Sequence, residues 1–151
     1  MNKHIEFRLN HALQIETLSP CIRGKVGAVI FNPKSYTIIS DGYNGPPRKG
    51  GDLCGGKECT RDNLKVVSGT RCEIGCHHAE SNAIANAARS GVSTLGMAIV
   101  ITCEPCLMCA KLIHHAGLDK VFYYSKGYSA DGLTYLRNIK LNVECVGGVK
   151  K

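Results

Sequence analysis

Apolar and polar positions in the first third of the chain follow a helical period and then a strand period. Apolar residues at helical spacing predict an amphipathic helix over residues 3–18, which Pro20 ends. Two short β-rich runs, 26–31 and 36–40, predict strands, and the turn residues 32–35 between them favour an antiparallel hairpin. The chain therefore begins with one helix and one pair of strands.

The second half of the chain alternates between helix and strand patterns. An alanine-rich stretch predicts a helix, and the apolar run after it is continuous, as in a strand covered on both faces. The expected elements are helix 78–89, strand 97–101, helix 105–116, strand 120–124, helix 131–139 and strand 142–146. Short connections make strands 97–101 and 120–124 parallel neighbours. We predict an α/β fold with one mixed five-stranded sheet flanked by helices.

A stretch without a long apolar period separates these two halves. Residues 41–47, Asp41-Gly42-Tyr43-Asn44-Gly45-Pro46-Pro47, are not expected to form regular structure. We expect a single domain, 1–151, with a Cys/Gly-rich insertion at about 46–77. A loop of this length inside a compact domain is usually functional or tied down by other contacts.

Composition narrows the class of protein. The 151 residues, 44% of them apolar, suit one globular domain with a core. No apolar run reaches the length of a membrane span, and the N-terminus lacks a secretory pattern, so a cytoplasmic protein is expected. The formal charge of +7 fits either an ordinary solvated surface or attraction of anions such as nucleotides or nucleic acid. Nine cysteines in a reducing compartment indicate metal binding.

Three residues at the starts of two predicted helices form a candidate zinc site. Cys106 and Cys109 lie three positions apart on one helix face, and His78 begins the other helix. Three protein ligands leave a fourth position for water, as in a catalytic zinc site. Glu80 is not needed as a ligand, and a carboxylate beside zinc-bound water can move its proton. Taken alone, the two cysteines fit a structural or redox-active pair equally well.

These motifs match a known signature. His78-Ala79-Glu80 followed by Pro105-Cys106-Leu107-Met108-Cys109 is the His-x-Glu and Pro-Cys-x-x-Cys pattern of zinc nucleobase deaminases. With Gly42-Tyr43-Asn44-Gly45 and the Cys109-Ala110-Lys111 continuation, the chain resembles the deoxycytidylate (dCMP) deaminases of the cytidine-deaminase superfamily. The resemblance runs from about Ser19 to Val146 and implies that superfamily's three-layer α/β/α fold.

The resemblance implies zinc-dependent hydrolysis of dCMP to dUMP and ammonia, a reaction that serves dTTP supply. Zinc would lower the pKa of its bound water, and Glu80 would take that proton. The hydroxide would attack C4 of cytosine, and Glu80 would protonate N3 and then the leaving amino group. The alternatives are dCTP or another free cytosine nucleotide or nucleoside, an adenosine in tRNA, a non-enzymatic zinc module, and a nucleic-acid-binding protein.

Four further residues are candidate substrate contacts, most of them through the resemblance. Asn44 is expected to bond the sugar or base, and Arg23 to face the 5′-phosphate. Tyr128 is a candidate for stacking on the pyrimidine, and Ala79 lies between ligand and acid. The alternatives are a turn residue for Asn44 and an ordinary surface residue for Arg23.

The insertion carries a candidate second zinc site. The spacing of its cysteines suits a closed tetrahedral structural site, with His77 or Cys21 as a substitute ligand, and the alternative is a set of free thiols. The four candidate ligands are Cys54, Cys59, Cys72 and Cys76.

The resemblance also implies regulation and assembly. We expect a homo-oligomer, with a hexamer favoured, activated by dCTP and inhibited by dTTP, each triphosphate carrying Mg²⁺. Arg48 and Lys49 are candidate triphosphate contacts, although an exposed basic loop has the same appearance. Membrane and nucleic-acid partners are not expected.

Overall fold

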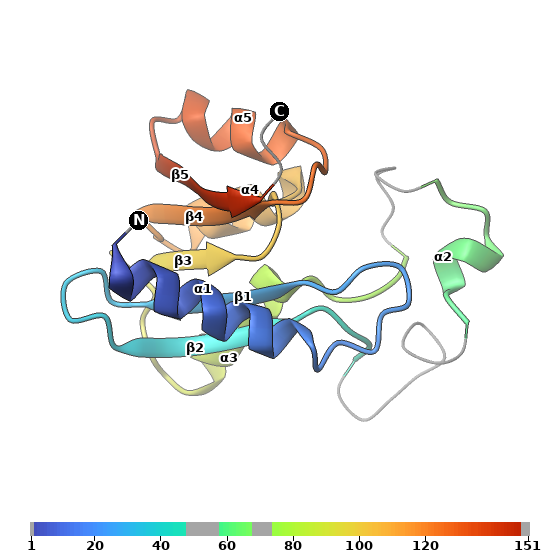
Figure 1. The fold of residues 1–151 in the computed structure, drawn as a ribbon, viewed down its shortest axis with the longest axis horizontal. Coiled ribbons are helices and arrows are strands. Elements are labelled where there is room, and N and C mark those ends of the chain that lie inside the picture. Colours follow the sequence, from blue (N-terminus) through green and yellow to red (C-terminus); the bar gives the residue numbers. More distant parts are fainter. Residues whose placement is uncertain (1, 48–57, 68–73, 149–151) are drawn as a thin grey trace.

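A mixed five-stranded sheet forms the centre of the molecule. The computed structural model describes residues 2–47, 58–67 and 74–148. The strands are β1 (Gly27–Phe31), β2 (Ile38–Tyr43), β3 (Ala98–Ile101), β4 (Lys120–Ser125) and β5 (Asn142–Gly148), in the order β2-β1-β3-β4-β5 (Figure 1). β1 is antiparallel to β2 and β3, whereas β3, β4 and β5 are parallel. The predicted hairpin, the parallel pair and the mixed sheet are therefore confirmed.

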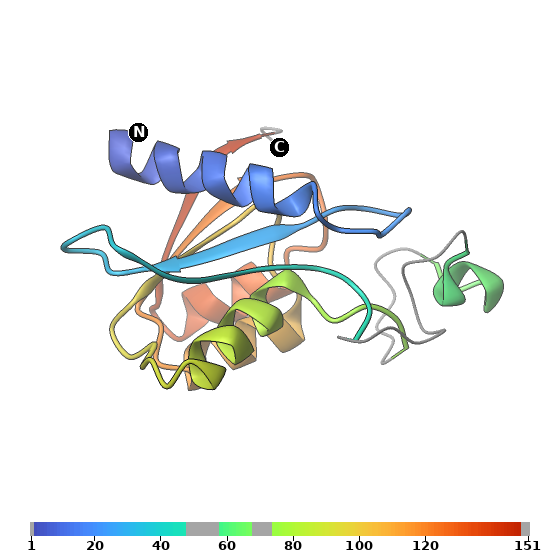
Figure 2. The same cartoon turned by 90° about the horizontal axis from the view of Figure 1, so that it is seen from below.

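Helices cover both faces of this sheet and produce three layers. The long helices are α1 (Lys3–Glu16), α3 (Ala79–Arg89), α4 (Leu107–His115) and α5 (Asp131–Asn138). Figure 2 shows α1 on one face, with α3, α4 and α5 on the other. The expected α/β/α arrangement is confirmed. No helix among the described residues has the length and apolar character needed to cross a bilayer.

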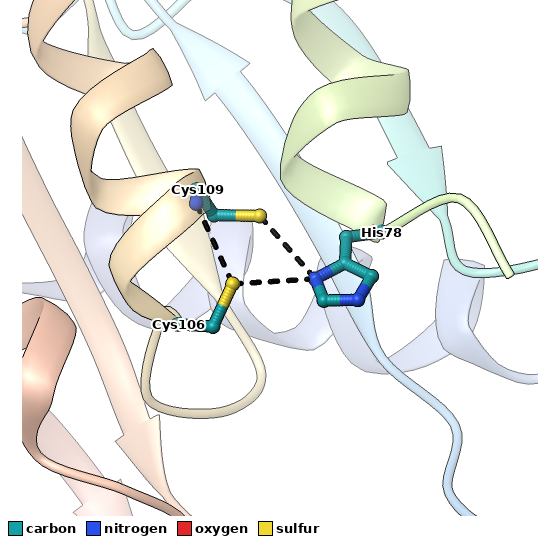
Figure 3. Close-up of side chains that lie close together, drawn as sticks. All are labelled: His78, Cys106 and Cys109. Atoms are coloured by element: carbon teal, nitrogen blue, oxygen red, sulfur yellow. Dashed lines mark hydrogen bonds between the residues drawn. The ribbon is translucent and has the colours of Figure 1, made fainter. Parts of the chain in front are cut away.

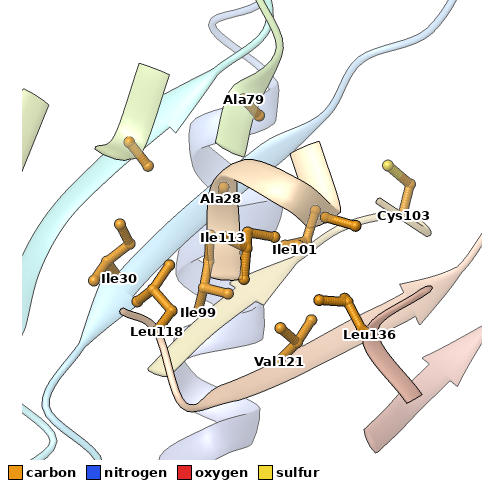
Figure 4. Packing of buried hydrophobic residues seen from close by; sticks show 12 residues of the cluster. Ala28, Ile30, Ala79, Ile99, Ile101, Cys103, Ile113, Leu118, Val121 and Leu136 are labelled. Carbon is orange, nitrogen blue, oxygen red and sulfur yellow. The ribbon is translucent and has the colours of Figure 1, made fainter. Parts of the chain in front are cut away.

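Alternating side chains in the central strands build two cores. On one face, Ile30, Ile99 and Val121 pack under α3, α4 and α5 (Figure 4). On the other face, Val29, Val100 and Phe122 pack under α1. Because successive strand residues point to opposite faces, a strand covered on both sides reads as a continuous apolar run. This explains why β1 and β3 have no polar alternation in the sequence.

Four chain segments meet at one edge of the sheet, which we call the loop edge. Gly27, at the start of β1, pairs with Tyr43, at the end of β2. The amide of Thr102, just after β3, donates to the Gly27 carbonyl at 3.0 Å. β3 and β4 run parallel, so the segment after β4 leaves at the same edge. The loop edge therefore gathers the residues before β1 and after β2, β3 and β4.

Two differences from the predicted elements concern residues 41–43 and the insertion. We expected no regular structure at 41–47, but β2 continues through Asp41, Gly42 and Tyr43, which pair with β1. Pairing with a buried neighbouring strand outweighs the turn propensity of Asp and Gly. Within the insertion, a short helix, α2 (Thr60–Asn63), stands apart from the sheet in both views (Figures 1 and 2).

Candidate functional site

Two helices begin at a cluster of one imidazole and two thiols. His78 precedes α3 and Cys106 precedes α4 as their N-cap residues, and Cys109 lies in the first turn of α4. His78 Nδ1 lies 3.5 Å from Cys106 Sγ and 3.4 Å from Cys109 Sγ (Figure 3). Among the described residues, these three form the metal-ligating group, with their ligand atoms within 4.8 Å of one another. The structure thus brings the three predicted ligands together.

The donor set fits zinc. A tetrahedral ion with Zn–S of about 2.3 Å and Zn–N of about 2.1 Å holds nitrogen and sulfur about 3.6 Å apart, close to the separations that His78 Nδ1 makes here. His78 and Cys106 are partly reached by solvent, whereas Cys109 is buried. The cluster is accordingly open on one side, which leaves room for a fourth ligand.

Local backbone structure fixes these side chains. The Cys106 sulfur accepts a hydrogen bond from the Cys109 amide at 3.4 Å, which caps α4. His77, just before α3, exchanges two backbone hydrogen bonds with Gly45, at 2.9 and 3.1 Å. Both helices point their N-termini at the cluster, and the partial positive charge there favours thiolate.

Hydrogen bonding divides the charge unequally between the two sulfurs. The bond from the Cys109 thiol, opposed by burial, lowers the pKa of Cys106 to about 4. The same bond and burial raise the pKa of Cys109 above its usual range. The contact with Cys106 raises the pKa of His78. Because ligands bind a metal in deprotonated form, loading of this site releases the proton held by the cluster.

Glu80 lies beside the cluster in the first turn of α3, and its side chain is buried, with 3% exposure. Burial raises the pKa of the Glu80 carboxyl, and the nearby His78 opposes that rise. A buried carboxyl next to three metal-ligating atoms is placed for proton transfer and is not needed for coordination. The arrangement agrees with the role that the sequence suggested for Glu80.

Three of the candidate substrate residues meet around Gly24 at the loop edge. Arg23 precedes Gly24 in the chain, and Asn44 Nδ2 donates to the Gly24 carbonyl at 2.9 Å. The Tyr128 hydroxyl lies so close to Gly24 that a Cβ built on this glycine would be 2.8 Å from it. Ala79, in contrast, is fully buried.

Asn44 and Arg23 both have partners within the chain. The Asn44 side chain also accepts from the Val26 amide at 2.8 Å, so it links the segments on either side of the β1–β2 pair. Arg23 lies 3.3 Å from Asp62 Oδ1 and donates to the Val66 carbonyl, and both partners belong to the insertion. Asn44 therefore has the structural role of its alternative interpretation, whatever further bond its remaining amide hydrogen makes.

The candidate second zinc site is only partly described. Cys54, Cys72, Arg48 and Lys49 lie outside the described residues. Cys59 is a buried free thiol, and Cys76 takes part in a disulfide bond. The alternative ligands also differ: Cys21 is a partly buried free thiol, and His77 is exposed.

Glu104 and Arg61 are two residues of this region that the sequence did not single out. Glu104 is buried and accepts four hydrogen bonds from residues 125–128. Arg61, in α2, is close enough to His78 to oppose the rise in the pKa of that imidazole. Glutamate before a Pro-Cys pair and arginine in a charged loop are ordinary patterns, and only the tertiary contacts give them meaning.

Comparisons with known proteins agree with this arrangement. Residues 2–125 match the family described as the cytidine and deoxycytidylate deaminase zinc-binding region. The chain therefore belongs to this family of zinc-binding deaminases, and the predicted family is confirmed.

Individual relatives lie in the same family. The ComE operon protein 2 of Bacillus subtilis is 36% identical over 110 residues, covering 73% of this chain and 52% of that protein. A deoxycytidylate deaminase of Schizosaccharomyces pombe is 34% identical over 117 residues, covering 77% of this chain and 35% of that protein. The chain thus spans about half and about a third of the lengths of these two relatives.

A solved structure matches over almost the whole chain. It is the dCMP deaminase of the cyanophage S-TIM5 in complex with dCMP and dUMP, with a TM-score of 0.78 and 30% identity. The match covers 97% of this chain and 99% of that one. The predicted cytidine-deaminase-like fold is thereby confirmed.

Proposed function

We propose that the protein catalyses the hydrolytic deamination of dCMP to dUMP with release of ammonia. The observation that carries the proposal is the cluster of His78, Cys106 and Cys109 with the buried Glu80 beside it. Family membership and the likeness to a structure named as a dCMP deaminase bound to dCMP and dUMP support the choice of substrate. We take the same single domain, 1–151, as the catalytic unit.

His78, Cys106 and Cys109 hold a zinc ion, which supplies Lewis acidity and lowers the pKa of a coordinated water. Glu80 removes the proton from the attacking water as its oxygen bonds to C4 of cytosine. Glu80 then delivers a proton to N3, and a further proton goes to the 4-amino group as the C4–N bond breaks. Water and dCMP are consumed, and dUMP and ammonia are formed.

The substrate is held at the loop edge. We assign Arg23 to the 5′-phosphate, Tyr128 to the pyrimidine face, and the remaining amide hydrogen of Asn44 to the sugar or base. The convergence of these residues on Gly24 supports this assignment. Arg23 exchanges its bond to Asp62 for the phosphate, because a bidentate phosphate contact is stronger than a half-exposed ion pair. Ala79 contributes through its backbone.

An assay of nucleotide specificity tests the function. Ammonia release and the absorbance change are measured with dCMP, dCTP, deoxycytidine and a deoxyadenosine oligonucleotide. Turnover of dCMP with the highest kcat/KM supports the proposal. Preference for dCTP or deoxycytidine moves the substrate within the same chemistry, and turnover of the oligonucleotide or of none of the four rejects the proposal.

Regulation and assembly belong to the same proposal. The protein is a homo-oligomer, a hexamer, that dCTP activates and dTTP inhibits, each with Mg²⁺. Repeating the dCMP assay with each triphosphate, with and without Mg²⁺, tests the regulation. Sedimentation of the same preparation gives the oligomeric state, and a monomer insensitive to both triphosphates contradicts this part.

The second zinc is proposed for the reduced protein. The disulfide at Cys76 competes with it, since a thiolate in a disulfide is no ligand. Metal analysis of protein purified with a thiol reductant is expected to give two zinc ions per chain, and one after oxidation. One zinc in both preparations removes the second site.

A further inference from the structure

Glu104 is a buried carboxylate that no step of the reaction uses. Its side chain is 7% exposed. Oε1 accepts from Ser125 Oγ at 2.6 Å and from the Gly127 amide at 3.1 Å. Oε2 accepts from the amides of Lys126 and Tyr128, at 3.1 and 3.2 Å. Four donors from four successive residues thus converge on one carboxylate.

These bonds shape the segment that follows β4, residues 125–128, which we call the 125–128 loop. Three consecutive amides turn inward toward Glu104, and Gly127 adopts a φ of +80°, a backbone conformation that favours glycine. Burial alone would raise the pKa of Glu104, but the bond from Ser125 and the loop amides lower it below its ordinary value. The loop is therefore folded around a charged acceptor.

A second carboxylate fixes the same loop from the other side. Lys126 Nζ lies 2.8 Å from Glu16 Oε2, at the end of α1, and donates to the Lys25 carbonyl at 2.9 Å. Glu16 also accepts from Thr102 Oγ1, just after β3, at 2.6 Å. The loop is thus tied to α1, to the segment before β1 and to the end of β3.

The result of this anchoring is the position of Tyr128. The aromatic ring leaves the loop at its last anchored residue and brings its hydroxyl against Gly24. Arg23 and the Asn44 amide group meet the same glycine. Glu104 itself lies two residues before Cys106 in the chain, so one short segment carries both a metal ligand and the loop's acceptor.

We propose that Glu104 is a positioning residue that holds the 125–128 loop, and with it Tyr128, in register with the metal cluster as one wall of the nucleotide site. The inference rests on the proposed function for the identity of the ligand, a cytosine nucleotide. Glu104 touches no substrate, because all four of its acceptor positions are filled from within the chain.

The test compares Glu104→Gln with two controls. An amide side chain keeps the shape of Glu104 but offers one oxygen and turns an NH₂ group toward backbone amides that need acceptors. We expect KM for dCMP to rise about tenfold with kcat changed by less than about threefold and zinc content unchanged. Ser125→Ala, which removes one donor and leaves the three amides bound, should raise KM less.

Val100→Ala separates positioning from general destabilisation. Val100 is buried on the opposite face of the sheet, against α1, so its truncation lowers Tm without touching the loop edge. We expect an unchanged KM in this variant. Hydrogen exchange of the amides of residues 126–128 gives a readout that needs no substrate: these amides exchange slowly in the wild type and fast in Glu104→Gln.

Two results overturn the proposal: unchanged exchange in Glu104→Gln, or faster exchange with an unchanged KM. A rise in KM equal to that of Val100→Ala at matched Tm overturns it as well. Failure of the wild type to deaminate dCMP rejects the proposed function instead. The KM comparison then moves to the nucleotide that the wild type does deaminate, and for an inactive wild type the exchange measurement alone decides.

Discussion

Glu80 combines burial with a place next to the three metal-ligating side chains. We expect Glu80→Gln to retain its fold and its zinc and to lose activity by about a thousandfold or more, because proton transfer by a positioned carboxyl contributes on the order of 10²–10⁴ in rate. Steady-state kinetics with dCMP, combined with metal analysis, measures both effects. Near-normal turnover in this variant would refute the assigned role.

Arg23 provides a second test at the same scale. Arg23→Gln is expected to raise KM about tenfold for dCMP and to leave KM for deoxycytidine unchanged, since only the nucleotide carries the phosphate. Asp62→Asn serves as the control: it removes the ion pair at 3.3 Å and frees the guanidinium, so KM for dCMP should stay equal or fall. Equal losses for both substrates in Arg23→Gln would exclude a phosphate contact.

Residues of the site differ in how far the sequence reveals them. His78, Glu80, Cys106 and Cys109 lie in two short motifs at helix starts, where spacing alone places side chains on one face. Glu104 could not be found this way, because its partners lie 21 to 24 positions away and are mostly backbone amides. Backbone donors have no residue type, so no pattern in the sequence marks them.

The contact between β2 and α3 is the closest approach of two elements that bears on the metal cluster. A Cβ at Gly42 would lie 2.5 Å from the Ala83 nitrogen and 2.6 Å from the Ala79 carbonyl oxygen. Asn82 and Asn86 donate from α3 to β2 carbonyls, at 2.8 and 2.7 Å. α3 therefore lies flush on β2 only because residue 42 has no side chain.

Gly42→Ala is expected to push α3 away from the sheet and to lower stability by about 2 kcal/mol or more, because backbone atoms cannot yield as side chains do. Zinc affinity should fall as well, since His78 caps the displaced helix. Gly45→Ala is the matched control, because the nearest atom to its Cβ is Pro20 Cδ at 3.5 Å. Thermal melts and zinc titrations of both variants make the comparison, and equal Tm values would contradict the steric argument.

Elements with a strong period were predictable, and those set by pairing were not. The predicted strands 26–31, 97–101 and 120–124 agree with β1, β3 and β4 to within a residue or two at each end. Residues 41–43 were expected outside β2, since Asp and Gly favour turns, yet the buried neighbour β1 extends the pairing. The helix α2, only four residues long, is too short to produce a period.

The metal cluster joins two helices that the sheet alone does not hold at their N-termini. We expect a chelator to abolish activity and to lower Tm by about 5 °C or more, because zinc binding contributes to the free energy of folding. Calorimetry of the full chain before and after chelation measures the shift, and added Zn²⁺ should restore both properties. Loss of activity without a change in Tm would mean that the ion has no structural effect.

The loop edge has a consequence for protein engineering. The insertion at 46–77 leaves the scaffold there, directly after β2. The apolar layers that stabilise the scaffold lie elsewhere, between strands and long helices. Grafting shorter or longer turns onto this rim should therefore retune which base or sugar is admitted while the underlying framework keeps its shape, so selectivity can be redesigned without redesigning stability.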